Sequence, residues 1–151
     1  MRGTYVLVLE VLDDVRVKAG RLGTLNVKRG IYLYVGSARG PGKFPLEARL
    51  RRHHQKKKKR FWHIDYLTTH RGVRILPTGA LVSQRWKECV LRDRLVKEVH
   101  GTIPFKDFGS SDCRCGGHLI YVPPQHRRHL QREVGRLGEV STTGEMAIKS
   151  F

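Results

Sequence analysis

The chain has 151 residues, of which 39% are hydrophobic and 28% are charged, a balance that suits one globular domain with a modest core. Lys and Arg number 30 against 13 acidic residues, and the resulting charge of +17 favours a polyanionic partner, most commonly nucleic acid. No apolar run approaches the roughly 20 residues of a membrane helix, and the first residues resemble no cleavable signal. We therefore expect a cytoplasmic protein with no membrane partner.

The first forty residues predict a small antiparallel sheet. Residues 3–12, GTYVLVLEVL, are β-branched and apolar and predict a strand. Residues 15–28 hold two short alternating runs around AGRLG, which predict a β-hairpin. Residues 30–36, GIYLYVG, predict another strand, which ends in the small-residue turn GSARGPG.

After this turn the hydrophobic period becomes helical. PLEARLRRHHQKKKK predicts a helix, FWHIDYLTTH a second short helix or turn, and VRILPTGALVS a broken strand. HLIYV predicts a last strand, PPQHRRHLQREVGRLG a basic helix, and the remaining residues a loose tail. The clearest helix is QRWKECVLRDRLVKEVHG, whose expected apolar stripe and stop are Trp86, Val90, Leu91, Leu95 and Gly101.

This order of elements predicts an α+β fold. It is a small, mainly antiparallel sheet flanked by helices, with an inserted β-hairpin. We assign residues 3–122 to this domain and residues 123–151 to the basic C-terminal helix and the loose tail.

Two glycine–tyrosine triplets lie on the two long predicted strands. Gly3-Thr4-Tyr5 opens the first strand, and Tyr34-Val35-Gly36 closes the later one. On this reading Gly30-Ile31-Tyr32 is a coincidental string at the start of the second strand. Downstream, Arg49 and His53 are four residues apart, so they share one face of the predicted helix.

This ordered set resembles the GIY-YIG nuclease superfamily, in which two such triplets are followed by a helix that carries Arg-x-x-x-His. WKECVLRDRL resembles the superfamily's metal-binding helix, with Glu88 before an apolar stripe. FWHIDYL and FGSSDCRCGGHLIY look like a mostly archaeal branch of uncharacterised domains, whose relatives are sometimes fused to a base-excision glycosylase. The resemblance covers roughly residues 3–122, and the hairpin at 15–28 is then an insertion.

The resemblance implies phosphodiester hydrolysis with one divalent ion. Tyr5 would be the base or would orient the water, and its ordinary pKa of about 10 would be lowered by nearby cations, Arg49 and His53. Tyr34 would hydrogen-bond the phosphate or the base, and Arg49 would stabilise transition-state charge. Glu88 would hold Mg²⁺ or Mn²⁺, which prefer oxygen ligands. The predicted catalytic residues are thus Tyr5, Tyr34, Arg49, His53 and Glu88.

We expect the nucleic-acid contacts beside this site. Phe61 and Trp62 follow the basic run and could stack on bases, although we expect Trp62 in the core. DNA is favoured over RNA, a repair protein is a candidate partner, and the oligomeric state stays open. Ordinary strand tyrosines and a solvated basic helix are the structural alternative. The predicted contacts to nucleic acid are Gly36, Ser37, Arg52, Lys56, Lys57, Lys58, Lys59 and Arg60.

The motif DCRCGGH forms a second group of candidate ligands. Cys113, Cys115 and His118 are plausible zinc ligands, and a fourth could come from Cys89, His63 or an aspartate. In a second interpretation the motif is a tight loop whose thiols act as small hydrophobes. A third interpretation places His63, Asp65 and Asp112 near the active site, as phosphate or metal contacts. The sequence leaves these interpretations open.

Two functions of different classes fit these features. The first is a divalent-metal-dependent endonuclease of nucleic acid, DNA above all, in repair or processing. The second is a catalytically silent nucleic-acid-binding module with the same fold, and a zinc-stabilised interaction domain is a third. Glu88 separates the first two, because only a nuclease has cleavage to lose in Glu88→Ala.

Overall fold

The computed structural model describes residues 2–76, 80–83, 87–109, 115–128, 130 and 146–149. Within these ranges six strands form one sheet with the order β7-β4-β1-β6-β8, and β5 also pairs with β1. Each of these pairings is antiparallel. The strands of this sheet are β1 (Gly3–Val11), β4 (Gly30–Ala38), β5 (Val73–Ile75), β6 (Ala80–Ser83), β7 (Leu119–Val122) and β8 (Met146–Lys149).

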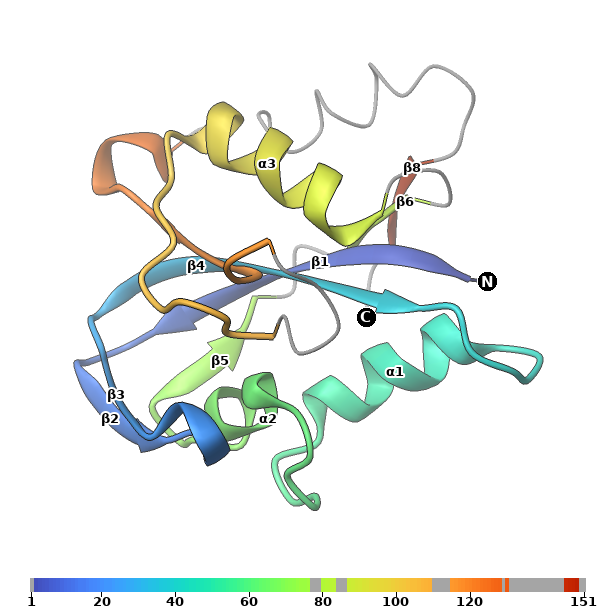
Figure 1. The fold of residues 1–151 in the computed structure, drawn as a ribbon, viewed down its shortest axis with the longest axis horizontal. Helices are drawn as coiled ribbons and strands as arrows, with labels where there is room; N and C mark the ends of the chain where they lie inside the picture. The colour runs from blue at the N-terminus through green and yellow to red at the C-terminus, as the bar shows by residue number, and fades with distance from the viewer. Residues whose placement is uncertain are drawn as a thin grey trace.

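Helices cover both faces of the sheet. Figure 1 shows α3 (Glu88–Val99) on one face, with α1 (Pro45–His54) and α2 (His63–Thr68) on the other. Successive side chains of a strand point to opposite faces, so β1 contributes to two cores. Val6 and Val8 pack with the α3 leucines, whereas Tyr5 and Leu7 pack with apolar residues of α1 and α2. This double burial explains the near-continuous apolar sequence of β1.

The predicted hairpin is present between β1 and β4. Strands β2 (Val15–Lys18) and β3 (Thr24–Val27) pair antiparallel as a separate two-stranded sheet, joined by a 3₁₀ turn at Gly20–Leu22. Its inward residues Val17 and Leu25 extend the core on the α1 and α2 side. The predicted α+β class, with a mainly antiparallel sheet and an inserted hairpin, is therefore confirmed.

The register of β1 and β4 brings the two predicted site tyrosines together. Tyr5 lies opposite Gly36, and Leu7 lies opposite Tyr34. Tyr5 and Tyr34 are therefore diagonal neighbours on one face of the sheet. A Cβ atom at Gly36 would lie 2.5 Å from Tyr5 Cζ. Glycine at this position thus makes room for the tyrosine ring.

The sheet edge opens beyond Tyr34. Strand β7 pairs with β4 only from Ile31↔Val122 to Tyr34↔Leu119. Among the described strands none pairs with residues 35–38 of β4 on that side. Side chains from α1 on one face and from the start of α3 on the other can therefore reach one space at this edge.

The buried stripe of α3 differs from the prediction. Val90 is 47% exposed, so it does not belong to the stripe, and Trp86 lies outside the described residues. The helix begins at Glu88, and its orientation about its own axis leaves the Val90 side chain on the face away from the sheet. The side chains that pack on the sheet are those of Leu91, Leu95 and Val99.

The end of α3 is set by two residues. His100 takes the left-handed conformation, with φ 50°, that a helix-ending glycine usually supplies. Gly101 follows it, and a Cβ atom there would lie 2.5 Å from Ile120 Cγ2. The glycine therefore allows the chain to pass close to β7, and the residue that ends the helix is His100.

The C-terminal region departs in part from its prediction. Pro124–His126 form a 3₁₀ turn, and most of the expected basic helix lies outside the described residues. Strand β8 pairs with β6 within the segment expected to be a loose tail. The exposed backbone groups of an edge strand can recruit such a short segment, which carries little signal of its own. None of the described helices has the length and apolar character needed to cross a bilayer.

Candidate functional site

A cavity of about 580 Å³ lies at the open edge of the sheet. Its walls come from both triplet strands, from α1 and from the first turn of α3. All five residues predicted as catalytic line it. The described residues that line the cavity are Thr4, Tyr5, Tyr34, Gly36, Ser37, Arg39, Arg49, His53, Trp62, Lys87, Glu88, Cys89, Val90, Gly109 and His118.

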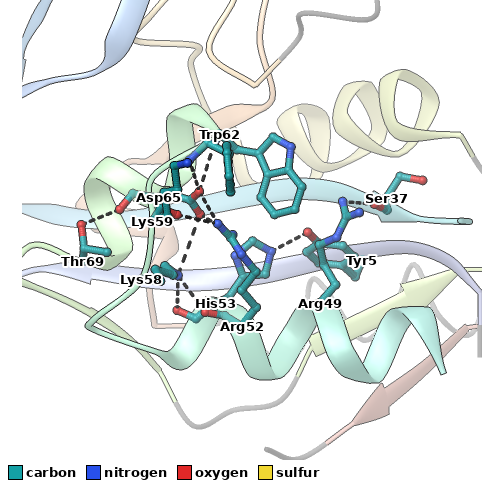
Figure 2. A network of polar contacts seen from close by, with 11 residues as sticks. Tyr5, Ser37, Arg49, Arg52, His53, Lys58, Lys59, Trp62, Asp65 and Thr69 are labelled. Carbon is teal, nitrogen blue, oxygen red and sulfur yellow. Dashed lines mark hydrogen bonds and ion pairs between the residues drawn. The ribbon is translucent and has the colours of Figure 1, made fainter. Parts of the chain in front are cut away.

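Tyr5 and His53 form a buried pair at the inner wall. The Tyr5 hydroxyl lies 2.6 Å from His53 Nε2, and each side chain is 1% exposed. Figure 2 shows this contact between β1 and α1. Burial, assisted by the charge of Lys58, lowers the pKa of His53 to about 3. The imidazole is therefore neutral near pH 7 and can accept a proton at Nε2.

The expectation that nearby cations lower the pKa of Tyr5 is wrong. Burial raises the pKa of Tyr5 well above its ordinary value, and Tyr34 adds to the rise. Arg49 acts in the opposite direction but does not offset the burial. Since His53 is neutral, it adds no positive charge either. Tyr5 is therefore a phenol, hydrogen-bonded to an imidazole, at neutral pH.

Arg49 lies at the mouth of the cavity against Trp62. Its Nη1 donates to the Ser37 carbonyl at 2.8 Å. The guanidinium carbons of Arg49 and Arg52 each lie 4.3 Å from the centroid of a Trp62 ring. Trp62 is 37% exposed and Phe61 is 67% exposed, so the expectation of Trp62 in the core is wrong. Trp62 precedes α2, whose own apolar residues occupy that part of the core.

Asp65 holds Arg52 in position, as Figure 2 shows. Its two oxygens each accept a hydrogen bond of 2.8 Å from Arg52, and Oδ2 also accepts the backbone N–H groups of Phe61 and Trp62. Burial alone would raise the pKa of Asp65, but Arg52 and the two amides lower it overall. Asp65 is fully buried and does not line the cavity. Its contacts make it a support for Arg52 and Trp62.

The lysine run divides into two groups. Lys56 Nζ donates to the carbonyls of His70 and Val73 at 2.9 and 2.5 Å. Lys58 Nζ donates to two carbonyls in the last turn of α1 at 2.8 and 3.1 Å, and burial lowers its pKa to about 8. These two side chains fix the backbone around the end of α1. Lys58 is half-buried, whereas Lys56 stays exposed in spite of its two contacts, as do the other members of the run, Lys57, Lys59 and Arg60.

Glu88 contacts His118 on the opposite side of the cavity. The distance from Glu88 Oε2 to His118 Nδ1 is 3.0 Å. Glu88 begins α3, where the helix dipole favours a negative charge. Among the described residues that line the cavity, Glu88 is the one carboxylate, and Arg39, Arg49 and Lys87 are cationic. The cavity is therefore electropositive with one anionic point.

Two sulfur atoms lie next to the other nitrogen of His118. Its Nε2 is 3.0 Å from Cys115 Sγ and 3.8 Å from Cys89 Sγ. The three candidate ligand atoms all lie within 4.8 Å of one another, close enough to hold a metal ion. Cys89, considered as a possible fourth ligand from the sequence, is thus part of this group. Asp112 and Cys113 lie outside the described residues.

His63 is not part of this group. Its Nδ1 accepts a hydrogen bond of 2.9 Å from the backbone N–H of Gly109. Gly109 lines the cavity next to Tyr34. A Cβ atom at Gly109 would lie 3.0 Å from Tyr34 Cε2. His63 therefore fixes a segment of the cavity wall. Of the FWHIDYL residues, Trp62 alone lines the cavity.

Sequence reasoning did not find several residues of the cavity. Arg39 and Lys87 contribute charge, and Thr4 accepts a hydrogen bond of 3.3 Å from Arg39 Nη2. Arg39 lies in the turn directly after the second triplet, and Lys87 directly before Glu88. Their adjacency to predicted site residues is the one signal in the sequence that could have indicated them.

Comparison with known protein families places residues 4–139 in a domain of unknown function, DUF123. No curated protein and no solved structure matches the chain. The matched range contains every residue that lines the cavity. Because the match extends over most of the sequence, the chain belongs to the DUF123 family.

Proposed function

We propose that this protein is a divalent-metal-dependent endonuclease that hydrolyses phosphodiester bonds in nucleic acid, with DNA the favoured substrate in repair or processing. The observation that carries the proposal is the convergence of a phenol, an imidazole, a guanidinium and a carboxylate on one cavity. The resemblance to the GIY-YIG nuclease superfamily supports the same reading, because the five residues it selects are the ones that meet there.

The charge of the cavity supports binding of a phosphate. Three cations, Arg39, Arg49 and Lys87, surround the one carboxylate among the described lining residues. Arg49 is held by the Ser37 carbonyl and by Trp62, so its donors are oriented before a substrate arrives. Trp62 itself lines the cavity and offers an exposed ring to a base. The +17 charge of the chain would draw the polyanion to this surface.

The Tyr5–His53 contact supplies a path for a proton. In this proposal Tyr5 takes a proton from the attacking water while its own hydroxyl proton passes to His53 Nε2, 2.6 Å away. The phenol then never has to ionise on its own. The relay avoids an isolated phenolate, which the raised pKa of Tyr5 disfavours. It places the proton on His53, whose pKa burial lowers to about 3, so the relay requires that the negative charge of the bound phosphate raise the pKa of His53.

Glu88 fits an oxygen-preferring ion. Mg²⁺ is typically held by one or two carboxylates together with waters and substrate phosphates, and Glu88 provides one carboxylate at the cavity wall. Mg²⁺ or Mn²⁺ bound there would polarise the phosphate and neutralise developing charge. Arg49 would bind the same phosphate from the facing wall.

A cleavage assay tests the proposal. Wild type and Glu88→Ala would be incubated with labelled single-stranded, duplex and branched DNA and with RNA, in Mg²⁺, in Mn²⁺ and in EDTA. Glu98→Ala is the matched control, because Glu98 lies on the same helix and does not line the cavity. We expect metal-dependent cutting in wild type and in Glu98→Ala, and binding without cutting in Glu88→Ala. Equal cutting by all three proteins would overturn the role of Glu88.

One observation favours the silent binding module. The raised pKa of Tyr5 and the near-complete burial of the Tyr5–His53 pair would also suit a purely structural hydrogen bond. In that case the same assay shows tight binding and no cutting on any substrate with any metal. Cutting that requires Glu88 excludes this second function.

A further inference from the structure

We propose that Cys89, Cys115 and His118 bind one divalent metal ion, which two thiolates and an imidazole identify as zinc. In this proposal the metal centre positions Glu88 through the His118 ring. The ion would be distinct from the oxygen-liganded ion proposed for catalysis. Metal binding by the three residues stands independently of the proposed nuclease. The positioning role rests on that function, because it concerns the carboxylate that the nuclease would use.

The spacing of the donor atoms fits tetrahedral coordination. Zinc–sulfur and zinc–nitrogen bonds of about 2.3 and 2.0 Å at tetrahedral angles place sulfur and nitrogen about 3.5 Å apart. The two sulfur–nitrogen distances, 3.0 Å for Cys115 and 3.8 Å for Cys89, lie on either side of this value. Shifts of about half an ångström would bring both sulfurs to bonding positions.

The orientation of His118 is that of a metal-bound imidazole. Its Nε2 points at the two sulfurs, and its Nδ1 lies 3.0 Å from Glu88 Oε2. A ligating histidine typically donates its second N–H to a carboxylate, which fixes the tautomer and the ring orientation. Glu88 lies at the distance of that carboxylate, but Nδ1 makes no hydrogen bond in this structure, so the Glu88 carboxylate would have to turn toward the ring when the ion binds. A buried ring with 1% exposure is held between the two interactions.

The backbone holds the ligands in place before any ion binds. The His118 N–H donates to the Phe108 carbonyl at 2.7 Å, and its carbonyl accepts the Val35 N–H at 3.0 Å. Arg92 Nη1 donates to the Gly117 carbonyl at 2.8 Å, which ties this loop to α3. Cys89 lies on the first turn of the same helix. The two segments that carry the ligands are therefore joined by a buried hydrogen bond.

The charges of the site balance with a divalent ion. Binding would release one proton from each thiol, and two thiolates would neutralise the two positive charges of the ion. The imidazole would bind in its neutral form, with its Nδ1 proton shared with Glu88. Thiolates select zinc over Mg²⁺, whose preferred ligands are oxygens. Three protein ligands leave a fourth position, which water fills in many zinc sites of this kind.

The experiment is a metal analysis of the full chain purified without a tag. Zinc content would be measured by mass spectrometry, and zinc affinity by competition with a chelator of known strength. Replacement by Co²⁺ would report thiolate ligands through the sulfur-to-cobalt absorption band. Cys89→Ser and Cys115→Ser test the sulfurs, and Glu88→Gln tests the carboxylate. His126→Gln is the control, because His126 stacks on His100 and lies outside the three-residue group.

We expect about one zinc per chain in wild type and in His126→Gln, with a sulfur-to-cobalt band in both. Each serine variant should lose most of that band and bind zinc far more weakly, whereas Glu88→Gln should keep the band and lose on the order of 10–100-fold in affinity. A wild-type chain that stays without zinc after reconstitution overturns the site. Zinc binding that the serine variants leave unchanged overturns the ligand set. Glu88→Gln affinity equal to wild type overturns the link to Glu88.

These results are independent of cleavage. Zinc bound with no cutting on any substrate would remove the proposed nuclease and leave the metal site standing. Cutting by a chain that binds no zinc would remove the metal site and leave the proposed nuclease standing. Because the serine variants could unfold, circular dichroism at the assay temperature would accompany each measurement, and the cobalt spectrum of wild type provides the ligand assignment without any variant.

Discussion

The two buried histidines of the cavity, His53 and His118, are each 1% exposed but have opposite electrostatic surroundings. His53 lies among Lys58, Arg49 and Arg52, and it contacts an uncharged phenol. His118 lies against the carboxylate of Glu88 and two sulfur atoms. Burial keeps the His53 ring neutral, with Lys58 adding to the effect and Asp65 opposing it, whereas His118 has the arrangement of a metal ligand. The two rings are equally buried, so what distinguishes them is the set of groups that each contacts.

The largest expected effect is on the His53 wall of the cavity. If the proposed relay operates, Tyr5→Phe removes the hydroxyl that connects the water to His53 and should lower the cleavage rate on the order of 10²–10⁴-fold. Tyr32→Phe is the matched control, since the Tyr32 hydroxyl donates to the Lys28 carbonyl and does not line the cavity. Single-turnover kinetics measures both. Equal rates in the two variants would rule out the relay.

Asp65 is the buried anion on the same side. Asp65→Ala would leave Arg52 without its partner and two amides without an acceptor. The free energy of unfolding should therefore fall by about 3 kcal/mol. Asp93→Ala breaks the ion pair between Asp93 and Arg92. Because the Asp93 side chain is 65% exposed, the free energy of unfolding should fall by less than about 1 kcal/mol. Urea denaturation compares the two. A similar loss in both would mean that Asp65 is not a structural support.

Gly36→Ala tests whether glycine makes room for Tyr5. The added Cβ atom would meet the Tyr5 ring, so the strand or the ring must shift at a cost of about 1–3 kcal/mol. Gly40→Ala is the control, because a Cβ atom at Gly40 would have nothing within 4 Å. Thermal denaturation of both variants is the measurement. A Gly36→Ala protein as stable as Gly40→Ala would contradict the observed crowding.

The last expected effect is spread over several pH units and concerns the charge of His53. Its pKa is 6.5 in the unfolded chain and about 3 in the folded protein, so between these values the unfolded chain binds the extra proton. Stability should therefore fall as the pH drops below 6.5, with a contribution of at most about 1.4 kcal/mol per pH unit. Asp65 adds to this loss only below about pH 5, because the carboxyl of the unfolded chain begins to bind its proton there, whereas its pKa in the folded protein lies below 3.8.

His53→Gln separates this contribution from that of the other histidines. Urea denaturation at several values between pH 6.5 and pH 4 would give the slope of stability against pH for each protein. We expect a smaller slope in the variant. An unchanged slope would mean that His53 takes up its proton in the folded state as readily as in the unfolded chain.

Much of the site could be predicted from the order of residue types along the chain. The spacing of Arg49 and His53 placed them on one helix face, and the triplets placed Tyr5 and Tyr34 on two strands. What could not be predicted is how burial changes these groups. Tyr5 was expected to have its pKa lowered by Arg49 and His53, as a catalytic base would need, but the desolvation of a fully buried ring outweighs Arg49. Solvent exclusion depends on packing from several elements.

The sequence by itself determined the α+β class and the inserted hairpin, because strand alternation, helical spacing and turn residues act locally. The five residues that meet at the cavity were selected by the resemblance to the GIY-YIG superfamily. Only the tertiary structure decided which lysines face solvent, that Trp62 stacks on two arginines, and that His118 joins Glu88 to Cys89 and Cys115. Apart from Cys115 and His118, those pairings connect residues ten to thirty positions apart. They follow from the sheet register and from the start of β7 at Leu119, opposite Tyr34, which leaves the edge open where both helix layers meet.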